Sequence, residues 1–158
     1  MRTFWILIAV ILFADPSRAS EYISVTLEKP IDRSADAAWA KIGSFCAVKD
    51  IFKFTCEYVT GNGDIGTVRK VADGRALEVM VGKTEHSYTF AFPQPNPIMF
   101  HGTIGVVPVT TDKSKAVFTL FWDQESLATP EAKASDKASR TALITRALNE
   151  MKILAEVR

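Results

Sequence analysis

Apolar and polar residues alternate with a period of two over most of the chain, which is the pattern of half-buried β-strands. The first such segment is 22–29, where Ile23, Val25 and Leu27 share one face. Six further segments show the same alternation, at residues 54–60, 65–72, 75–82, 86–92, 98–109 and 115–124. Turn residues separate several of these segments, so the pattern predicts an antiparallel sheet of about seven strands.

Two short segments after the first strand have helical spacing instead. Ser34 is a suitable N-cap residue, and Trp39, Ile42 and Phe45 recur three residues apart to form an apolar stripe. Residues 46–54 predict a second short helix, whose buried side would consist of Val48, Ile51 and Phe52.

The end of the chain predicts one long helix. Thr129 can cap it, and Pro130 suits the first helical position. The expected buried stripe consists of Leu143, Ala147, Met151 and Leu154, with Ile144, Leu148 and Ala155 beside it. Arg140 is expected to be mostly solvated. A long antiparallel sheet has a face to cover, and this helix is the element able to cover it, so an α+β fold is predicted, with a cavity between sheet and helix.

The hairpin at residues 66–81 places two charged residues opposite each other. With Asp73-Gly74 as the turn, Arg69 faces Glu78 across the strands, about 5 Å apart at the Cβ atoms. Both faces of this hairpin carry apolar residues, so the pattern leaves the direction of the pair open. It is either a solvated ion pair that supports the hairpin or a buried polar pair.

Residues 1–19 have the features of a secretory signal peptide. Arg2 precedes an apolar run from Phe4 to Ala14, and Ala19 stands at a suitable cleavage position. The alternative is an uncleaved N-terminal anchor. With cleavage, the domain comprises residues 20–158, is secreted or periplasmic, and has no stable membrane insertion.

Charge and cysteine content limit the possible partners. Without residues 1–19, Lys plus Arg falls from 19 to 17 and Asp plus Glu from 18 to 17, so the domain is formally neutral. A neutral domain without a basic run gives no reason to expect nucleic-acid binding. An oxidising compartment favours a disulfide between Cys46 and Cys56. A metal site is the alternative, but the sequence holds only two histidines, His86 and His101, and no metal is expected.

Residues 38–58, 61–81 and 86–92 resemble the SRPBCC (START-like) superfamily. Within it, the sequence is most similar to the polyketide cyclase/dehydrase and lipid-transport family, over about residues 22–156. The resemblance implies a helix-grip fold with a deep apolar cavity. The chain departs from many relatives at Ile51-Phe52, where they carry Trp-His, and at Phe100, where they often carry Tyr. These departures weaken any acid–base mechanism carried over from the family.

The resemblance also implies which residues form the site. The matching Arg and Glu point into the cavity in the family, and some enzymatic members use them for proton transfer, so Arg69 and Glu78 are candidate catalytic residues. Strand aromatics between Tyr88 and Trp122 would be core or cavity wall. The expected ligand-binding residues are Arg69, Glu78, Met80, Tyr88, Phe90, Phe100, Trp122, Leu148 and Met151. No cofactor is expected, since no phosphate loop or nucleophile motif is present.

Two functions from different classes follow. The first is an exported carrier of a hydrophobic small molecule, such as a lipid, a sterol or a polyketide-like compound, which needs only a cavity and a few orienting polar groups. The second is a cavity enzyme of the cyclase, dehydratase or isomerase type, which needs a proton-transfer group such as Glu78. A third, simpler possibility is an interaction module with a filled core. The predicted fold hosts both binding proteins and enzymes, so fold alone does not choose between them.

Overall fold

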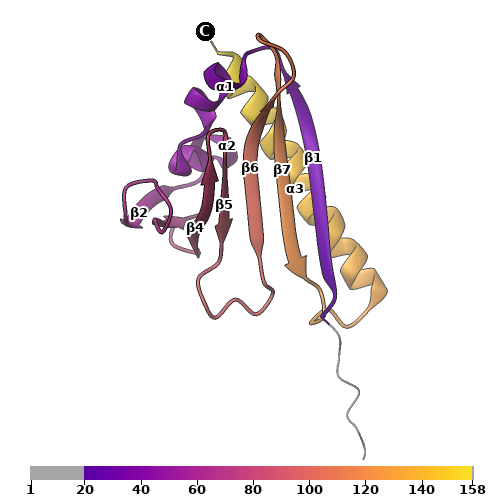
Figure 1. Ribbon diagram of the computed structural model, residues 1–158. Helices are drawn as coiled ribbons and strands as arrows, with labels where there is room; N and C mark the ends of the chain where they lie inside the picture. The colour runs from indigo at the N-terminus through magenta and orange to yellow at the C-terminus, as the bar shows by residue number, and fades with distance from the viewer. Residues whose placement is uncertain (1–19, 158) are drawn as a thin grey trace, which may run out of the picture.

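The computed structural model describes residues 20–157, and the predicted signal peptide lies outside the described residues. The described chain contains seven strands, three α-helices and a short 3-10 helix (Figure 1). In chain order they are β1 (Tyr22–Ile31), α1 (Ala35–Ile42), η1 (Phe45–Ala47), α2 (Val48–Phe52), β2 (Cys56–Thr60), β3 (Val68–Val71), β4 (Ala76–Thr84), β5 (Ser87–Ala91), β6 (His101–Pro108), β7 (Ser114–Asp123) and α3 (Pro130–Glu156). Among the described helices, none combines the length and apolarity that crossing a bilayer requires.

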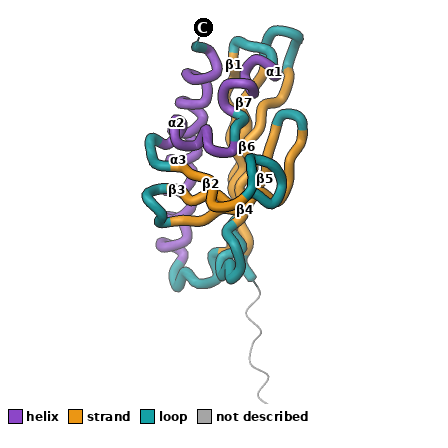
Figure 2. The backbone as a smooth tube through the Cα atoms, turned by 90° about the vertical axis from the view of Figure 1, so that its left-hand side faces the viewer, coloured by secondary structure: helices purple, strands orange, loops and turns teal. Residues whose placement is uncertain are grey.

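All seven strands belong to one antiparallel sheet, in the order β1-β7-β6-β5-β4-β3-β2. The last strand, β7, pairs with the first, so the first and last strands lie side by side at one edge of the sheet. Figure 2 shows α2 and α3 on the same side of the strands. The predicted α+β helix-grip architecture, with two short helices after the first strand, is confirmed.

The long helix packs on the sheet through an apolar stripe. Its buried residues are Ile144, Ala147, Leu148, Met151 and Ala155, which recur three or four positions apart. Pro130 occupies the first turn, and the Thr129 hydroxyl accepts a hydrogen bond from the Ala132 amide at 3.1 Å, as a capping residue does. The predicted start of the helix is therefore confirmed.

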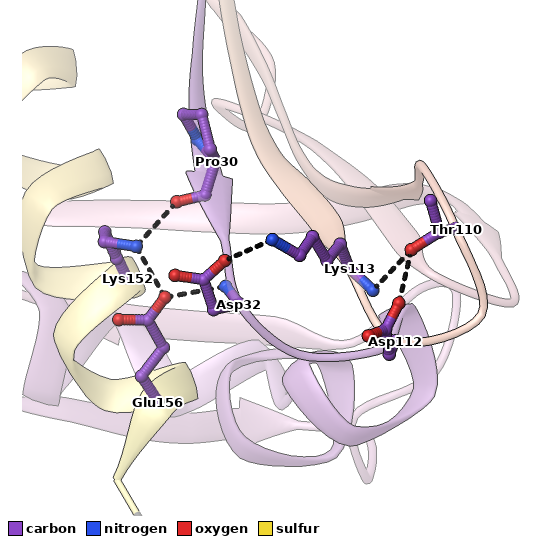
Figure 3. Close-up of polar contacts among 7 residues, drawn as sticks. All are labelled: Pro30, Asp32, Thr110, Asp112, Lys113, Lys152 and Glu156. Atoms are coloured by element: carbon purple, nitrogen blue, oxygen red, sulfur yellow. Dashed lines mark hydrogen bonds and ion pairs between the residues drawn. The ribbon is translucent and has the colours of Figure 1, made fainter.

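Polar contacts fix the C-terminal end of α3 to the neighbouring loops (Figure 3). The Lys152 ammonium donates to the Pro30 carbonyl at 3.0 Å, and the Glu156 carboxylate accepts from the Asp32 amide at 2.7 Å. Lys113, in the β6–β7 hairpin, lies 3.5 Å from the Asp32 carboxylate. The helix end, the loop after β1 and this hairpin are thus tied together.

The hairpin of β3 and β4 has the predicted register, with Arg69 paired to Glu78. Its loop is longer than the predicted two residues. The turn covers residues 72–75, and Ala72, Asp73 and Gly74 all have positive φ. One extra residue on each side of the Asp-Gly pair leaves the register unchanged. The Thr55 hydroxyl accepts from the Asp73 amide at 2.6 Å and supports this loop.

Burial shows which face of this hairpin is directed toward the core, a question that the sequence pattern left open. Thr67, Arg69 and Val71 are buried, and Met80 on β4 joins them. Residues of the opposite face are exposed, including Leu77 at 43% and Val81 at 48%. The Arg69–Glu78 pair therefore lies on the face that the helices cover.

The predicted disulfide between Cys46 and Cys56 is present, with the Cα atoms 5.6 Å apart. It joins η1 to the start of β2, across ten positions of sequence. A bond between these segments removes conformations from the unfolded chain, which stabilises the fold by about 2–3 kcal/mol on the chain-entropy model. It also links η1 covalently to β2, the strand that pairs with β3.

Candidate functional site

A cavity of about 200 Å³ lies between the β3–β7 part of the sheet and helices α2 and α3. Each residue that lines it is buried or partly buried. The lining is apolar apart from one ion pair, and six phenylalanines contribute to it. The lining residues are Val48, Phe52, Phe54, Arg69, Val71, Ala72, Ala76, Glu78, Phe90, Phe92, Phe100, Phe118, Leu120 and Leu143.

The two charged lining residues, Arg69 and Glu78, form the ion pair in the cavity wall. The Glu78 Oε2 atom lies 2.6 Å from Arg69 Nε and 2.6 Å from Arg69 Nη2. The arginine side chain is 1% exposed and the glutamate side chain 12% exposed. Two donors on one carboxylate oxygen give a fixed orientation, so the pair is a built element of the wall rather than a solvated surface contact.

The guanidinium group of Arg69 is enclosed on its other sides. Its Nη1 group donates to the Phe45 carbonyl of η1 and lies 3.5 Å from the Tyr88 hydroxyl oxygen, a long contact. The Arg69 Cζ atom stands 3.9 Å from the centre of the Phe45 ring and 5.0 Å from that of Phe90. Cation–π contacts and the backbone acceptor compensate the burial of this charge.

Tyr88 is buried next to Arg69. Burial raises the pKa of its phenol, while the Arg69 charge acts in the opposite direction. The hydroxyl is therefore a neutral group at physiological pH, and it does not belong to the cavity lining. Its position beside Nη1 makes it a support for the arginine.

Glu78 is the member of the ion pair that keeps a free polar atom at the cavity wall. Its Oε2 atom is occupied by Arg69, whereas Oε1 makes no hydrogen bond within residues 20–157. Ser114 Oγ is the one fully buried side-chain polar atom without a hydrogen-bond partner in residues 20–157, so Oε1 is not completely buried. Glu78 therefore contributes to the cavity wall a carboxylate whose second oxygen has free lone pairs.

The structure separates the predicted ligand-binding residues into three groups. Arg69, Glu78, Phe90 and Phe100 line the cavity. Met80 and Tyr88 border a different hollow, which Trp39, Phe45 and Tyr58 also line. The remaining three, Trp122, Leu148 and Met151, are buried in the core and are not part of the cavity lining.

The lining residues that sequence reasoning missed as contacts to a ligand include three on the helix side, namely Phe52, Phe54 and Leu143. Phe52 and Phe54 stack with ring centres 5.3 Å apart, and Phe52 is the last residue of α2. The same three residues line a groove on the surface between α2 and α3, so they form the partition between cavity and solvent. The available signal was the spacing of two aromatic residues around Lys53, which carries a positive φ of 59° at the end of α2.

Arg140 was expected to be solvated, and this expectation is wrong. Its side chain is 25% exposed, and its Cζ atom lies 4.8 Å from the ring centre of Trp122. Its Nε group donates to the Asp136 carboxylate at 3.0 Å, and the same carboxylate accepts from the Trp122 indole at 2.7 Å. This network fixes the first half of α3 to the sheet, which explains why Trp122 is committed to the core.

The two histidines lie away from the cavity. His86 is in the β4–β5 turn, and its Nε2 atom is 2.6 Å from the Asp36 carboxylate in the first turn of α1. Glu85 stands beside this pair at the surface. His101 begins β6 and contacts the Met99 carbonyl at 2.5 Å. The His86–Asp36 contact is a surface clasp between α1 and the turn.

Comparison with known proteins supports the fold. No family model and no curated protein matches the chain. Solved structures do match it. The Zhui aromatase/cyclase from Streptomyces sp. R1128 superposes with a TM-score of 0.69 at 16% identity, over 86% of this chain and 94% of that one. A norcoclaurine synthase from Thalictrum flavum, in complex with dopamine and hydroxybenzaldehyde, superposes with a TM-score of 0.62 at 17% identity, over 99% of each chain. Ara h 8.0201 superposes with a TM-score of 0.54 at 17% identity, over 82% of this chain and 97% of that one.

These three structures differ from the chain at more than four positions in five, so their likeness concerns the fold. They are SRPBCC superfamily proteins, and the helix-grip architecture expected from the sequence resemblance is the one they share.

Proposed function

We propose that this chain, which has the helix-grip fold of the SRPBCC superfamily, is an exported protein that binds a small hydrophobic molecule in the cavity beside Arg69 and Glu78. The observation that carries the proposal is an apolar cavity of about 200 Å³ whose only charged lining residues, within the described chain, are these two. Ligand sites are typically apolar spaces with a few placed polar groups.

The size of the cavity narrows the proposal. Typical ligand pockets measure about 300–1,000 Å³, and an apolar cavity of about 150 Å³ holds benzene. A space of about 200 Å³ therefore suits a compact molecule or one end of a longer one. A whole sterol or acyl chain requires the partition formed by Phe52, Phe54 and Leu143 to move. The solved norcoclaurine synthase holds dopamine and hydroxybenzaldehyde, so the fold accommodates small aromatic molecules.

Export belongs to the same proposal. The signal-like segment 1–19 precedes the domain, and the Cys46–Cys56 disulfide is compatible with an oxidising compartment. A carrier outside the cytoplasm needs no cofactor, because burial of apolar surface supplies the affinity.

Binding is favoured over catalysis by the composition of the wall. Among the described residues, the lining offers one carboxyl group and one guanidinium, with no histidine, cysteine or hydroxyl group. Catalysis by proton transfer remains a second candidate because Glu78 lines the cavity and its Oε1 atom makes no hydrogen bond within residues 20–157. In that case Glu78 takes a proton from carbon and returns it elsewhere on the same molecule.

The proposal is tested by native mass spectrometry of the protein, followed by calorimetric titration with small apolar molecules. Wild type is expected to bind, and Ala76→Phe, which fills the cavity, is expected to lose binding. Leu77→Phe is the matched control, because Leu77 is the next residue and lies on the exposed face. Equal binding by the two variants would show that the molecule does not bind in this cavity.

A separate measurement distinguishes binding from proton transfer. The co-purified molecule is incubated with the protein in deuterated water. Deuterium incorporation at a carbon position by wild type, but not by Glu78→Gln, supports catalysis. Recovery of the molecule with unchanged mass supports binding alone.

A further inference from the structure

The ion pair in the cavity wall is asymmetric, and this asymmetry selects the ligand. Arg69 lines the cavity, but its polar groups are already occupied: Nε and Nη2 contact Glu78, and Nη1 contacts the Phe45 carbonyl and Tyr88. Its 1% exposure leaves no guanidinium surface for a ligand. The group that meets a ligand is the Glu78 carboxylate.

A carboxylate oxygen accepts hydrogen bonds and cannot donate them. The lone pairs of Glu78 Oε1 therefore seek an O–H or N–H donor. A ligand that carries its own carboxylate places a second negative charge beside this oxygen and provides no donor. Such a ligand also loses its hydration on entering an apolar space, which makes its binding unfavourable.

The charge of Glu78 is already balanced by Arg69, and this determines which donor fits. A ligand ammonium group would bring an unbalanced positive charge into the apolar space, next to a pair that is neutral overall. A neutral hydroxyl group supplies the missing donor without adding charge. A hydroxyl group therefore fits as the polar end of the ligand.

The rest of the lining determines the body of the ligand. The six phenylalanines are Phe52, Phe54, Phe90, Phe92, Phe100 and Phe118. Among them, Phe92 and Phe100 stack with ring centres 4.5 Å apart. Flat aromatic walls pack well against another ring, and about 200 Å³ accommodates one ring with a short substituent.

From these contacts we infer that the ligand of this cavity is a small neutral phenol or aromatic alcohol, whose hydroxyl group donates a hydrogen bond to Glu78 Oε1, and that carboxylic acids of the same shape are rejected. The inference rests on the proposed function, and it adds the chemical class that the cavity prefers.

The test compares ligands that share one body and differ in one group. Calorimetry measures the binding of 4-methylphenol, toluene, 4-methylbenzylamine and 4-methylbenzoate to the full domain at pH 7. A hydrogen bond to a charged acceptor is worth enough to favour 4-methylphenol over toluene by about tenfold or more. Binding of 4-methylbenzoate or of the amine is expected to be weaker than that of 4-methylphenol by at least the same factor.

A double variant, Arg69→Met/Glu78→Met, serves as the second measurement. It replaces both buried charges with apolar groups of similar length, a change that buried ion pairs often tolerate. The variant is expected to bind toluene and to lose the tenfold preference for 4-methylphenol. Retention of that preference would overturn the role of Glu78.

The outcomes separate this inference from the proposal on which it rests. If toluene binds as tightly as 4-methylphenol, or if the benzoate or the amine binds best, the cavity is a binding site but the hydroxyl inference is wrong. If none of the four molecules binds to wild type, the proposed function itself fails.

Discussion

The Oε2 atom of Glu78 lies 2.6 Å from two nitrogen atoms of Arg69, across the β3–β4 pair, while the other carboxylate oxygen of this cavity-lining residue makes no hydrogen bond within residues 20–157. A single carboxylate thus has two separate roles. One oxygen holds a buried arginine in place, and the other is available to a bound molecule. Changes at Glu78 are therefore expected to affect both the stability of the domain and ligand binding.

Glu78→Gln is expected to destabilise the domain by about 3–5 kcal/mol, because Arg69 stays buried after its countercharge is removed. The matched control is Glu57→Gln. Glu57 also forms an ion pair within the sheet, with Lys70 at 2.5 Å, but the two side chains are 65% and 43% exposed. That change should cost under about 1 kcal/mol. Urea denaturation measures the unfolding free energy of the two variants. Similar losses of unfolding free energy would show that Arg69–Glu78 behaves as a surface pair.

Gly102→Ala is expected to disturb the cavity through Phe90. A Cβ atom at position 102 would lie 2.3 Å from the Cζ atom of the Phe90 ring, so this ring has to move. We expect a loss of about 1–3 kcal/mol and weaker binding of 4-methylphenol. Gly82→Ala is the control, since its nearest contact would be Thr89 Cβ at an ordinary 3.7 Å. Unchanged binding by Gly102→Ala would place the ligand away from Phe90.

The disulfide is expected to stabilise the site as well as the fold. Cys46 follows Phe45, whose carbonyl accepts a hydrogen bond from Arg69. The variant Cys46→Ser/Cys56→Ser should lose about 2–3 kcal/mol of unfolding free energy. It should also bind 4-methylphenol more weakly, because the backbone that supports Arg69 is less restrained. Reduced stability with unaltered affinity for 4-methylphenol would show that the disulfide does not support the site.

Asp136 predicts a specific dependence of stability on pH. Burial alone would raise its pKa, but hydrogen bonds from Gln124 and Trp122, together with Arg140, lower it below the ordinary value of 3.8. A carboxyl group whose pKa is lower in the folded state stabilises fully above the unfolded pKa. This contribution disappears as the pH falls through the folded pKa.

The measurement is the difference in unfolding free energy between wild type and Asp136→Asn, obtained by urea denaturation at pH 7, 5 and 3. The difference should be about 1 kcal/mol at pH 7 and 5 and smaller at pH 3, because protonation removes the advantage of the native carboxylate. Other carboxyl groups cancel in this difference. A difference that stays constant from pH 7 to pH 3 would show that the charge of Asp136 contributes nothing.

Local signals in the sequence were sufficient for most of the fold. The Asp73-Gly74 pair set the register that opposes Arg69 to Glu78, because a loop extended by one residue on each side keeps the same pairs. Capping at Thr129 set the start of α3. These features depend on a few neighbouring residues, and local physical chemistry decides them.

The boundary of the cavity depended on packing between distant segments. Leu143 and Phe54 meet at the cavity although 89 positions separate them, and no periodicity reveals such a contact. A register shift between Met80 and Gly82 also interrupts the alternation along β4, which a strict period of two does not predict. Trp122 was expected at the ligand, but its indole nitrogen is bound by Asp136 from the next helix.

The most direct test of the account is an NMR titration of the isotopically labelled domain with 4-methylphenol. The account predicts saturable shifts at cavity-lining positions such as Val71, Ala76 and Leu143, with intermolecular contacts between the ligand ring and their methyl groups. Leu77 and Val81, on the exposed face of the same hairpin, should remain unchanged. Shifts confined to the outer face, or no saturable shift at millimolar ligand, would contradict the claim that this cavity binds small hydrophobic molecules.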